Sequence, residues 1–153
     1  MDSTANTDVV MWANKLVCLK DVACPYVADP FTLETLEYDP FKSEIESQTF
    51  TAHPKIDPYT NELVVSGYEA KGLATLDVET YTLNKESKKV NELWLKSPRC
   101  AFIHDSAITK NWLILMLWPF EAISNGCRKS DNIGLGDTIN QSLSSSFLVG
   151  KLP

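Results

Sequence analysis

The sequence is divided into short segments rich in Val, Leu, Tyr, Thr and Trp, often with alternating apolar and polar residues. These segments lie at residues 9–12, 15–20, 62–70, 73–83, 89–95 and 112–117. A period of two places successive side chains on opposite faces of an extended strand. Combinations of Asn, Asp, Pro and Ser separate the segments, and these residues favour chain reversal. The sequence therefore predicts an all-β protein built of antiparallel meanders.

Two short patterns occur twice and suggest a repeated architecture. Asp29-Pro-Phe-Thr-Leu-Glu and Asp57-Pro-Tyr-Thr-Asn-Glu share an Asp-Pro-aromatic-Thr-x-Glu pattern, and the segments that begin at Asn14 and Asn111 also resemble each other. With two copies of each, coincidence is the alternative. Radially repeated meanders are typical of propeller blades of about 40–50 residues, so the chain would hold about three. Three blades do not close a ring, and an open set leaves strand edges uncovered.

Charge and hydropathy exclude several classes of partner. The chain of 153 residues has 14 Lys and Arg against 20 Asp and Glu, which argues against binding to nucleic acid or anionic lipid. Its longest apolar run, residues 112–120, contains Pro119, and it is far shorter than the roughly 20 residues of a membrane-spanning helix. The amino terminus is acidic and polar, unlike a signal peptide. We expect a cytoplasmic protein without a transmembrane segment.

Two segments depart from the strand pattern. Residues 27–48 hold most of the net negative charge and two prolines, so we expect a solvated connecting loop there. From residue 123 the sequence becomes rich in Gly, Ser and Asn and loses the alternation except at Ser146–Val149, which predicts a poorly ordered tail over 123–153. The cysteines form no CxxC pair, so we expect buried, reduced thiols rather than a zinc site or disulfides. They are Cys18, Cys24, Cys100 and Cys127.

The chain has two histidines, so one copy cannot complete a metal site that needs three or four imidazoles. His53 and His104 each end a short apolar run and precede a polar or turn residue. This pattern indicates strand ends, where the residues of propeller blades face the central axis. A hydrogen-bonded structural histidine is the alternative for each, because their separation in sequence forms no local chelate.

Three segments of the sequence resemble the carotenoid cleavage oxygenase family. They are Phe50-Thr-Ala-His-Pro-Lys-Ile-Asp-Pro, Gly67-Tyr-Glu-Ala-Lys-Gly-Leu and Ile103-His-Asp-Ser-Ala-Ile-Thr. The resemblance implies a fragment of a seven-bladed β-propeller over residues 1–122, followed by the divergent tail over 123–153. It also implies one non-haem Fe(II), held on the propeller axis by four histidines, and cleavage of a carbon–carbon double bond with O2 into two carbonyl products. His53 and His104 would be the first two iron ligands.

The resemblance assigns roles to three residues near the amino terminus. Asp21 stands where the family has a glutamate that accepts a hydrogen bond from a ligating imidazole, and its side chain has one methylene less reach. Lys20 matches the lysine with which stilbene-cleaving members, of the lignostilbene and resveratrol type, hold a phenol oxygen; a cation there favours the phenolate. Thr7 resembles a threonine whose methyl group crowds one iron position. An exposed edge-strand lysine and a turn threonine are the structural alternatives.

Two functions of different classes follow. The first is an iron(II)-dependent dioxygenase that cleaves a small hydrophobic substrate, a stilbenoid or an apocarotenoid, with O2. The chain would be a truncated member, because we identify neither the first blade nor a third and a fourth histidine. The second is a non-catalytic propeller relic that binds no metal tightly. The histidine count favours the relic for this chain, whereas the motifs favour the oxygenase.

Overall fold

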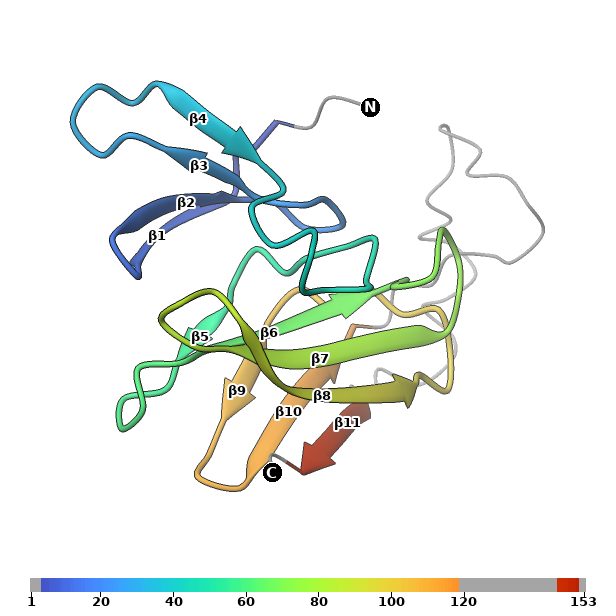
Figure 1. Cartoon of the computed structure of the whole chain (residues 1–153). Coiled ribbons are helices and arrows are strands. Elements are labelled where there is room, and N and C mark those ends of the chain that lie inside the picture. Colours follow the sequence, from blue (N-terminus) through green and yellow to red (C-terminus); the bar gives the residue numbers. More distant parts are fainter. Residues whose placement is uncertain (1–3, 119–145, 152–153) are drawn as a thin grey trace.

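A computed structural model describes residues 4–118 and 146–151, which form three antiparallel sheets (Figure 1). The first sheet has the order β1-β2-β3-β4 and comprises Asp8–Trp12, Lys15–Leu19, Tyr26–Ala28 and Thr35–Tyr38. The second has the order β5-β6-β7-β8 and comprises Lys55–Ile56, Leu63–Tyr68, Asp77–Leu83 and Lys89–Lys96. The third has the order β11-β10-β9, in which β9 is Ser106–Ile108, β10 is Trp112–Leu117 and β11 is Ser146–Lys151.

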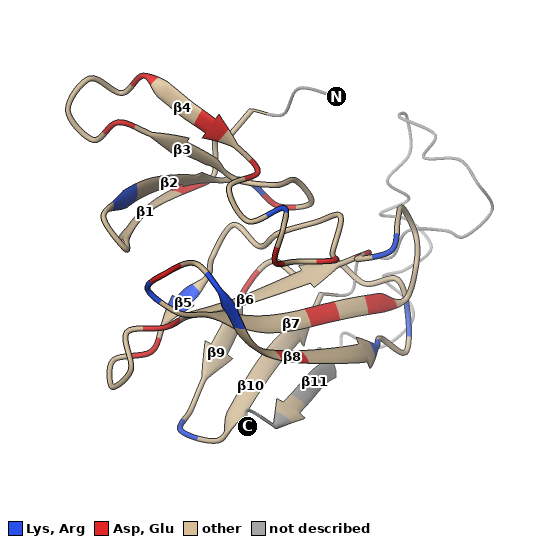
Figure 2. Ribbon diagram, in the orientation of Figure 1, with Lys and Arg blue, Asp and Glu red and all other residues tan. Residues whose placement is uncertain are grey.

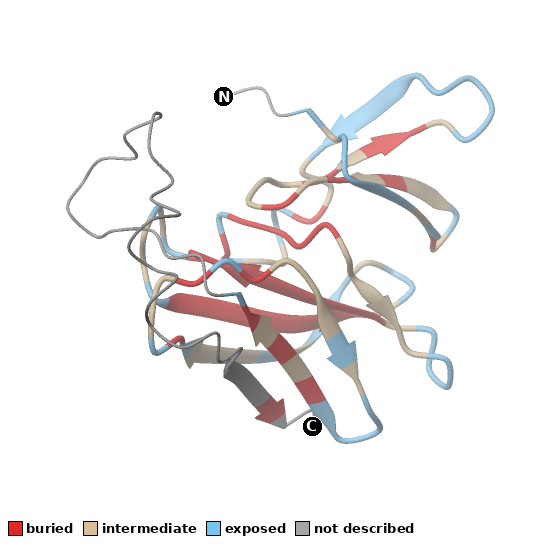
Figure 3. Cartoon of the chain, turned by 180° about the vertical axis from the view of Figure 1, so that it is seen from behind, coloured by how far each residue is buried: buried red, intermediate tan, exposed pale blue. Residues whose placement is uncertain are grey.

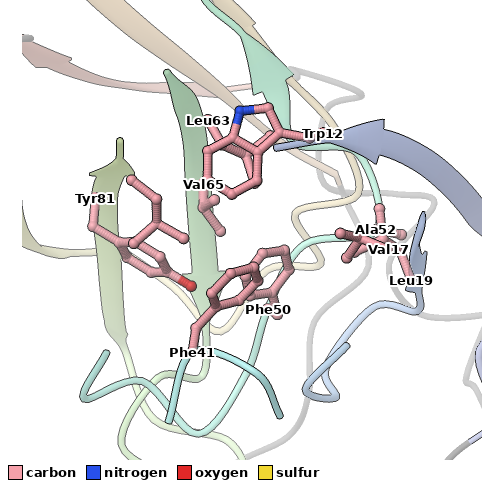
Figure 4. Close-up of a cluster of buried hydrophobic side chains, with 10 residues drawn as sticks. Trp12, Val17, Leu19, Phe41, Phe50, Ala52, Leu63, Val65 and Tyr81 are labelled. Carbon is pink, nitrogen blue, oxygen red and sulfur yellow. The ribbon is translucent and has the colours of Figure 1, made fainter. Parts of the chain in front are cut away.

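The second sheet lies between the other two, and both of its faces are covered. One face contributes Leu63, Val65, Tyr81 and Leu83 to a buried cluster with residues of the first sheet, such as Trp12 (Figure 4). The other face packs against Leu113, Leu115 and Leu117 of the third sheet. Every residue of β6 and β7 is therefore buried (Figure 3). Stacked meanders of sequential strands are the arrangement of neighbouring propeller blades, and the prediction of an all-β fold with about three blades is confirmed.

The hairpin turns follow the chemistry of their residues. Ala13 and Asn14 have φ values of 48° and 60°, and two left-handed residues between strands are the signature of a type I′ turn. In both Asp-Pro-aromatic-Thr motifs the Asp carboxylate accepts hydrogen bonds from the amides two and three residues later. The same turn is thus built twice. It joins β3 to β4 at Asp29 and β5 to β6 at Asp57, so the two copies occupy different places in their sheets.

The prediction of a solvated loop over residues 27–48 is correct for its exposure but wrong in part, because the segment contains a strand hairpin and a few buried residues. β3 and β4 pair there as a hairpin, and Phe41 is fully buried. The Phe41 ring lies between Trp12 and Phe50, with centroid distances of 6.3 and 5.8 Å (Figure 4). Most of the acidic residues lie on the exposed β4 and beside it (Figure 2). Buried residues such as Phe41 were not predicted because acidic residues dominate the composition of this segment.

The carboxyl-terminal segment and the cysteines also differ in part from expectation. Of the predicted poorly ordered tail, residues 146–151 form β11, which pairs with β10 along its whole length, and residues 123–145 lie outside the described residues, together with Cys127. Cys18, Cys24 and Cys100 form no disulfide in the described part of the chain, and they are half-buried rather than buried. Residues 4–118 and 146–151 contain no helix that is long and apolar enough to cross a membrane.

Candidate metal centre

The two histidines occupy the same position in successive sheets. His53 lies two residues before β5, and His104 lies two residues before β9, which are the first strands of their sheets. The centres of the two imidazole rings are 4.7 Å apart and the ring planes meet at 82°. The side chains are 26% and 38% exposed, respectively. Stacking of the two sheets therefore brings together two imidazoles that are far apart in the sequence.

In each of the two imidazoles, Nδ1 contacts a carboxylate oxygen. His104 Nδ1 is 2.6 Å from Asp21 Oδ2, and His53 Nδ1 is 3.2 Å from Asp8 Oδ2. A carboxylate can only accept a hydrogen bond, so each contact places a proton on Nδ1. A neutral imidazole with its proton on Nδ1 keeps a lone pair on Nε2, the form in which histidine binds a metal.

Asp21 has a second contact beside the other histidine. Its Oδ1 accepts a hydrogen bond from the backbone amide of Ala52 at 3.0 Å, and Ala52 directly precedes His53. The Asp21 side chain is 12% exposed. One side chain therefore holds the ring of His104 and the backbone next to His53, and the missing methylene does not prevent the contact with the imidazole.

The contact of Asp8 with His53 was not predicted, although the sequence contains a signal for the position of Asp8. The type I′ turn at Ala13 and Asn14 fixes the register of the first hairpin, which pairs Asp8 with Leu19. Asp8 thus starts β1 next to the residues where β2 ends and Asp21 follows. Counting paired residues outward from the turn predicts that Asp8 lies opposite Leu19, and therefore that a second carboxylate lies near Asp21.

The separation of the rings suits two ligands of one cation. With a metal–nitrogen bond of about 2.1 Å and about 1.2 Å from that nitrogen to the ring centre, two imidazoles that bind one cation with a nitrogen–metal–nitrogen angle of about 90° have centres about 4.7 Å apart, whatever the angle between their ring planes. The observed distance is 4.7 Å. The donor set therefore fits a divalent metal that accepts neutral imidazole. Among the described residues no group of three or more His, Cys, Asp or Glu side chains is placed to hold a metal ion.

Lys20 and Thr7 lie at the same end of the first sheet. The Thr7 amide donates a hydrogen bond to the Leu19 carbonyl at 3.1 Å. Thr7 itself is exposed, and its hydroxyl lies 3.4 Å from Asn6 Oδ1. Lys20 is half-buried and directly precedes Asp21. The structure thus places both residues near the carboxylates, without a hydrogen bond from either side chain to a histidine in the part of the chain that it describes.

An aromatic side chain covers one ring of the pair. Phe102 stacks on His104 with a centroid distance of 5.7 Å and an interplanar angle of 16°. Tyr68 meets the edge of Phe102 at 5.5 Å. Phe102 is 39% exposed. Sequence reasoning missed this residue, although a residue two positions before a histidine in an extended segment lies on the same face.

The segment that leads to His53 crosses the second sheet through a buried polar network. The Ser47 amide donates to Glu79 Oε2 at 2.6 Å, and the Thr49 hydroxyl donates to the Tyr68 carbonyl at 2.6 Å. Burial raises the pKa of Glu79, which is fully buried, against the opposing effects of the Ser47 amide and a nearby lysine. Gly67 lies beneath the crossing, where an added Cβ would be 2.5 Å from the Thr49 carbonyl oxygen.

Gly67→Ala is expected to destabilise the protein by about 1–3 kcal/mol, because the added methyl group overpacks a backbone crossing. The Thr49 oxygen that it would meet belongs to the main chain, so a change of rotamer cannot relieve the clash. Urea unfolding followed by circular dichroism measures the loss, with Lys85→Ala in the exposed β7–β8 turn as the control. Equal stability of the two variants would show that the crossing shifts freely.

Comparison with known proteins adds to this geometry. The sequence matches the family described as retinal pigment epithelial membrane protein over residues 1–149. It is 72% identical over 123 residues to resveratrol cleavage oxygenase 1 from Botryotinia fuckeliana, covering 80% of this chain and 22% of that protein. For isoeugenol monooxygenase from Pseudomonas putida the identity is 41% over 117 residues, covering 76% of this chain and 24% of that protein.

The structure is also similar to solved structures. The lignostilbene dioxygenase from Pseudomonas brassicacearum superposes with a TM-score of 0.76 at 40% identity, and the match covers 79% of this chain and 25% of that protein. The chain thus spans about a quarter of the length of the relatives that it matches.

Proposed function

The chain belongs to the retinal pigment epithelial membrane protein family, the carotenoid oxygenases, and on this basis we propose that it supplies part of an iron(II)-dependent dioxygenase that cleaves a stilbenoid double bond with O2. The observation that carries the proposal is the pair of imidazoles 4.7 Å apart, each with Nδ1 at a carboxylate. An isolated structural histidine would not need a second imidazole at right angles to it.

His53 and His104 would hold the iron through Nε2, and a longer chain or a partner would provide the remaining ligands. When bound, Fe(II) supplies the redox chemistry by which O2 reacts with an alkene. Asp8 and Asp21 keep the proton of each ring on Nδ1 and fix the ring orientation. A carboxylate at this position also raises the basicity of the ligand. Phe102 limits rotation of the His104 ring by stacking on it.

Lys20 supports a phenolic stilbenoid over a carotenoid hydrocarbon as the substrate. A half-buried ammonium group loses hydration, and a hydrocarbon offers no acceptor that would compensate for this loss. A para-hydroxystilbene offers a phenol oxygen, which the ammonium group stabilises as phenolate. The phenolate pushes electron density through the ring into the alkene. The names of the relatives from Botryotinia fuckeliana and Pseudomonas brassicacearum include resveratrol and lignostilbene, which agrees with this choice.

Lys20→Met is expected to lower kcat/KM for a 4-hydroxystilbene by a factor of about 10 or more, the scale of one lost charge-assisted hydrogen bond. Because the chain spans about a quarter of its relatives, the assay uses a chimera. Residues 5–122 replace the matching segment of a complete lignostilbene dioxygenase, and product aldehydes are measured by chromatography.

Lys85→Met, at an exposed turn far along the chain from the site, is the matched control and should leave kcat/KM unchanged. A 4-methoxystilbene, which cannot ionise, should be cleaved poorly by the parent chimera and no worse by Lys20→Met. Full activity of Lys20→Met on the phenol would contradict the assignment of Lys20 and would favour apocarotenoids as substrates.

A further inference from the structure

An ion pair joins the two segments that carry the histidines. Lys55 Nζ lies 2.7 Å from Asp105 Oδ1. Lys55 is two residues after His53 and begins β5, and Asp105 directly follows His104 before β9. β5 and β9 are in contact. This contact is the point where the second sheet meets the third beside the paired imidazoles.

We propose that Lys55 and Asp105 are positioning residues, whose ion pair sets the separation of the two imidazoles so that both can bind one cation. The inference rests on the proposed role of His53 and His104 as metal ligands. It assigns a function to two side chains that do not themselves touch the metal.

The local structure explains why such a link is needed. β5 has only two residues, which pair with Val64 and Leu63 of β6, so few hydrogen bonds hold the strand that follows His53. Asp21 provides one link between the two segments, through the Ala52 amide and the His104 ring. The Lys55 ion pair provides a second link, on the other side of His53. Two links restrict the relative motion of the segments far more than one.

Asp105 is held in place for this contact. Its Oδ1 also accepts a hydrogen bond from the Ser106 amide at 2.7 Å. The ion pair with Lys55 and this hydrogen bond involve the same oxygen, so together they fix the orientation of the Asp105 carboxylate.

The effect should appear in metal binding more than in stability. The two side chains are 31% and 47% exposed, and exposed ion pairs contribute little to the free energy of unfolding. A chelate is different, because the second ligand binds tightly only when it is already held at the right distance from the first. Loss of the ion pair widens the distribution of ring separations and lowers the population that can bind one ion with both rings.

The test is a titration of the 153-residue chain with Cu²⁺, which binds imidazole most strongly among the divalent metals of its row. Electron paramagnetic resonance reports how many nitrogens are bound to copper. The parent chain should show two equivalent imidazole nitrogens. Asp105→Asn and Lys55→Met should weaken Cu²⁺ binding by a factor of about 10, the lower range for residues that support metal ligands, and should shift the spectrum toward one nitrogen.

Three further variants separate positioning from general destabilisation. Lys88→Met breaks another ion pair of the same length, 2.7 Å to Glu44, and should leave both the affinity and the spectrum unchanged. The double variant Lys55→Asp with Asp105→Lys restores an ion pair of reversed polarity and should recover the two-nitrogen spectrum. Lys55→Arg keeps the charge and should bind like the parent chain.

The outcomes distinguish this inference from the proposed function. If His53→Ala leaves the copper spectrum unchanged, the proposed metal site is wrong. If His53→Ala removes one nitrogen but Asp105→Asn and Lys55→Met bind copper as the parent does, the positioning role is wrong and the metal site stands. If Asp105→Asn does not fold, the comparison of Lys55→Met with Lys55→Arg tests the positioning role. That role predicts that Lys55→Met weakens Cu²⁺ binding and that Lys55→Arg does not.

Discussion

His53→Ala in the chimera described above is expected to abolish stilbene cleavage and to lower the iron content well below one per chain. An alanine removes one imidazole from a site whose affinity depends on the number of ligands and on their preset geometry. The loss should affect binding of the metal first, so added phenolic substrate will not restore activity. Iron analysis of the purified chimera and single-turnover product assays measure the two effects separately.

Tyr59→Ala is the control for this experiment. Tyr59 is 90% exposed at the tip of the β5–β6 turn, close to His53 in sequence and remote from it in function. Retention of iron and activity in His53→Ala would contradict the ligand assignment. A parent chimera that folds but neither holds iron nor cleaves a stilbene would instead favour the non-catalytic relic, the second interpretation of the sequence.

Asp21→Asn is expected to weaken metal binding by a factor of about 10–100, with little loss of stability. The asparagine keeps an oxygen that can accept from the Ala52 amide, a contact of 3.0 Å in the structure. Its amide nitrogen cannot accept from His104 Nδ1, which is 2.6 Å from Asp21 Oδ2. The imidazole then gains by moving its proton to Nε2, the nitrogen that should bind the metal. Calorimetric titration measures the metal affinity, and urea unfolding measures the free energy of unfolding.

Two other substitutions at this position make the interpretation specific. Asp21→Leu removes both acceptors, so it should weaken metal binding as Asn does and also destabilise the protein by about 1–3 kcal/mol, through the buried Ala52 amide left without its partner. Asp21→Glu keeps the carboxylate and should bind metal within a few-fold of the parent. Equal metal affinity in Asp21→Asn and the parent would contradict the role of Asp21.

The strands and turns could be predicted because their signals are local. Short segments rich in Val, Leu, Tyr, Thr and Trp mark β1, β2, β6, β8 and β10 directly, since such residues favour extended strands. Asn14 and the two Asp-Pro motifs specify turns through their own backbone preferences and side-chain hydrogen bonds. The number of sheets follows from these elements. The prediction that the histidines end strands is not met, because His53 and His104 lie outside strands, two residues before β5 and β9.

Other features depend on how the sheets stack, which no local pattern encodes. Thr80 and Thr82 on one face of β7 and Glu79 on the other are polar residues that a strand usually exposes, yet they are buried because another sheet covers each face. The buried Phe41 could not be recognised in an acidic segment for the same reason. The predicted roles of Lys20 and Thr7 stay predictions, because they depend on a substrate and a metal.

Local signals are enough to predict the strand segments and the turn residues, since each depends on neighbouring residues alone. The contacts of the site depend on tertiary packing: the two imidazole rings lie 4.7 Å apart, Asp8 and Asp21 contact their Nδ1 atoms, and an ion pair joins Lys55 to Asp105. These contacts join residues of different sheets. Their geometry follows from the packing of three sheets against one another, and that packing depends on the shape of every buried side chain at once.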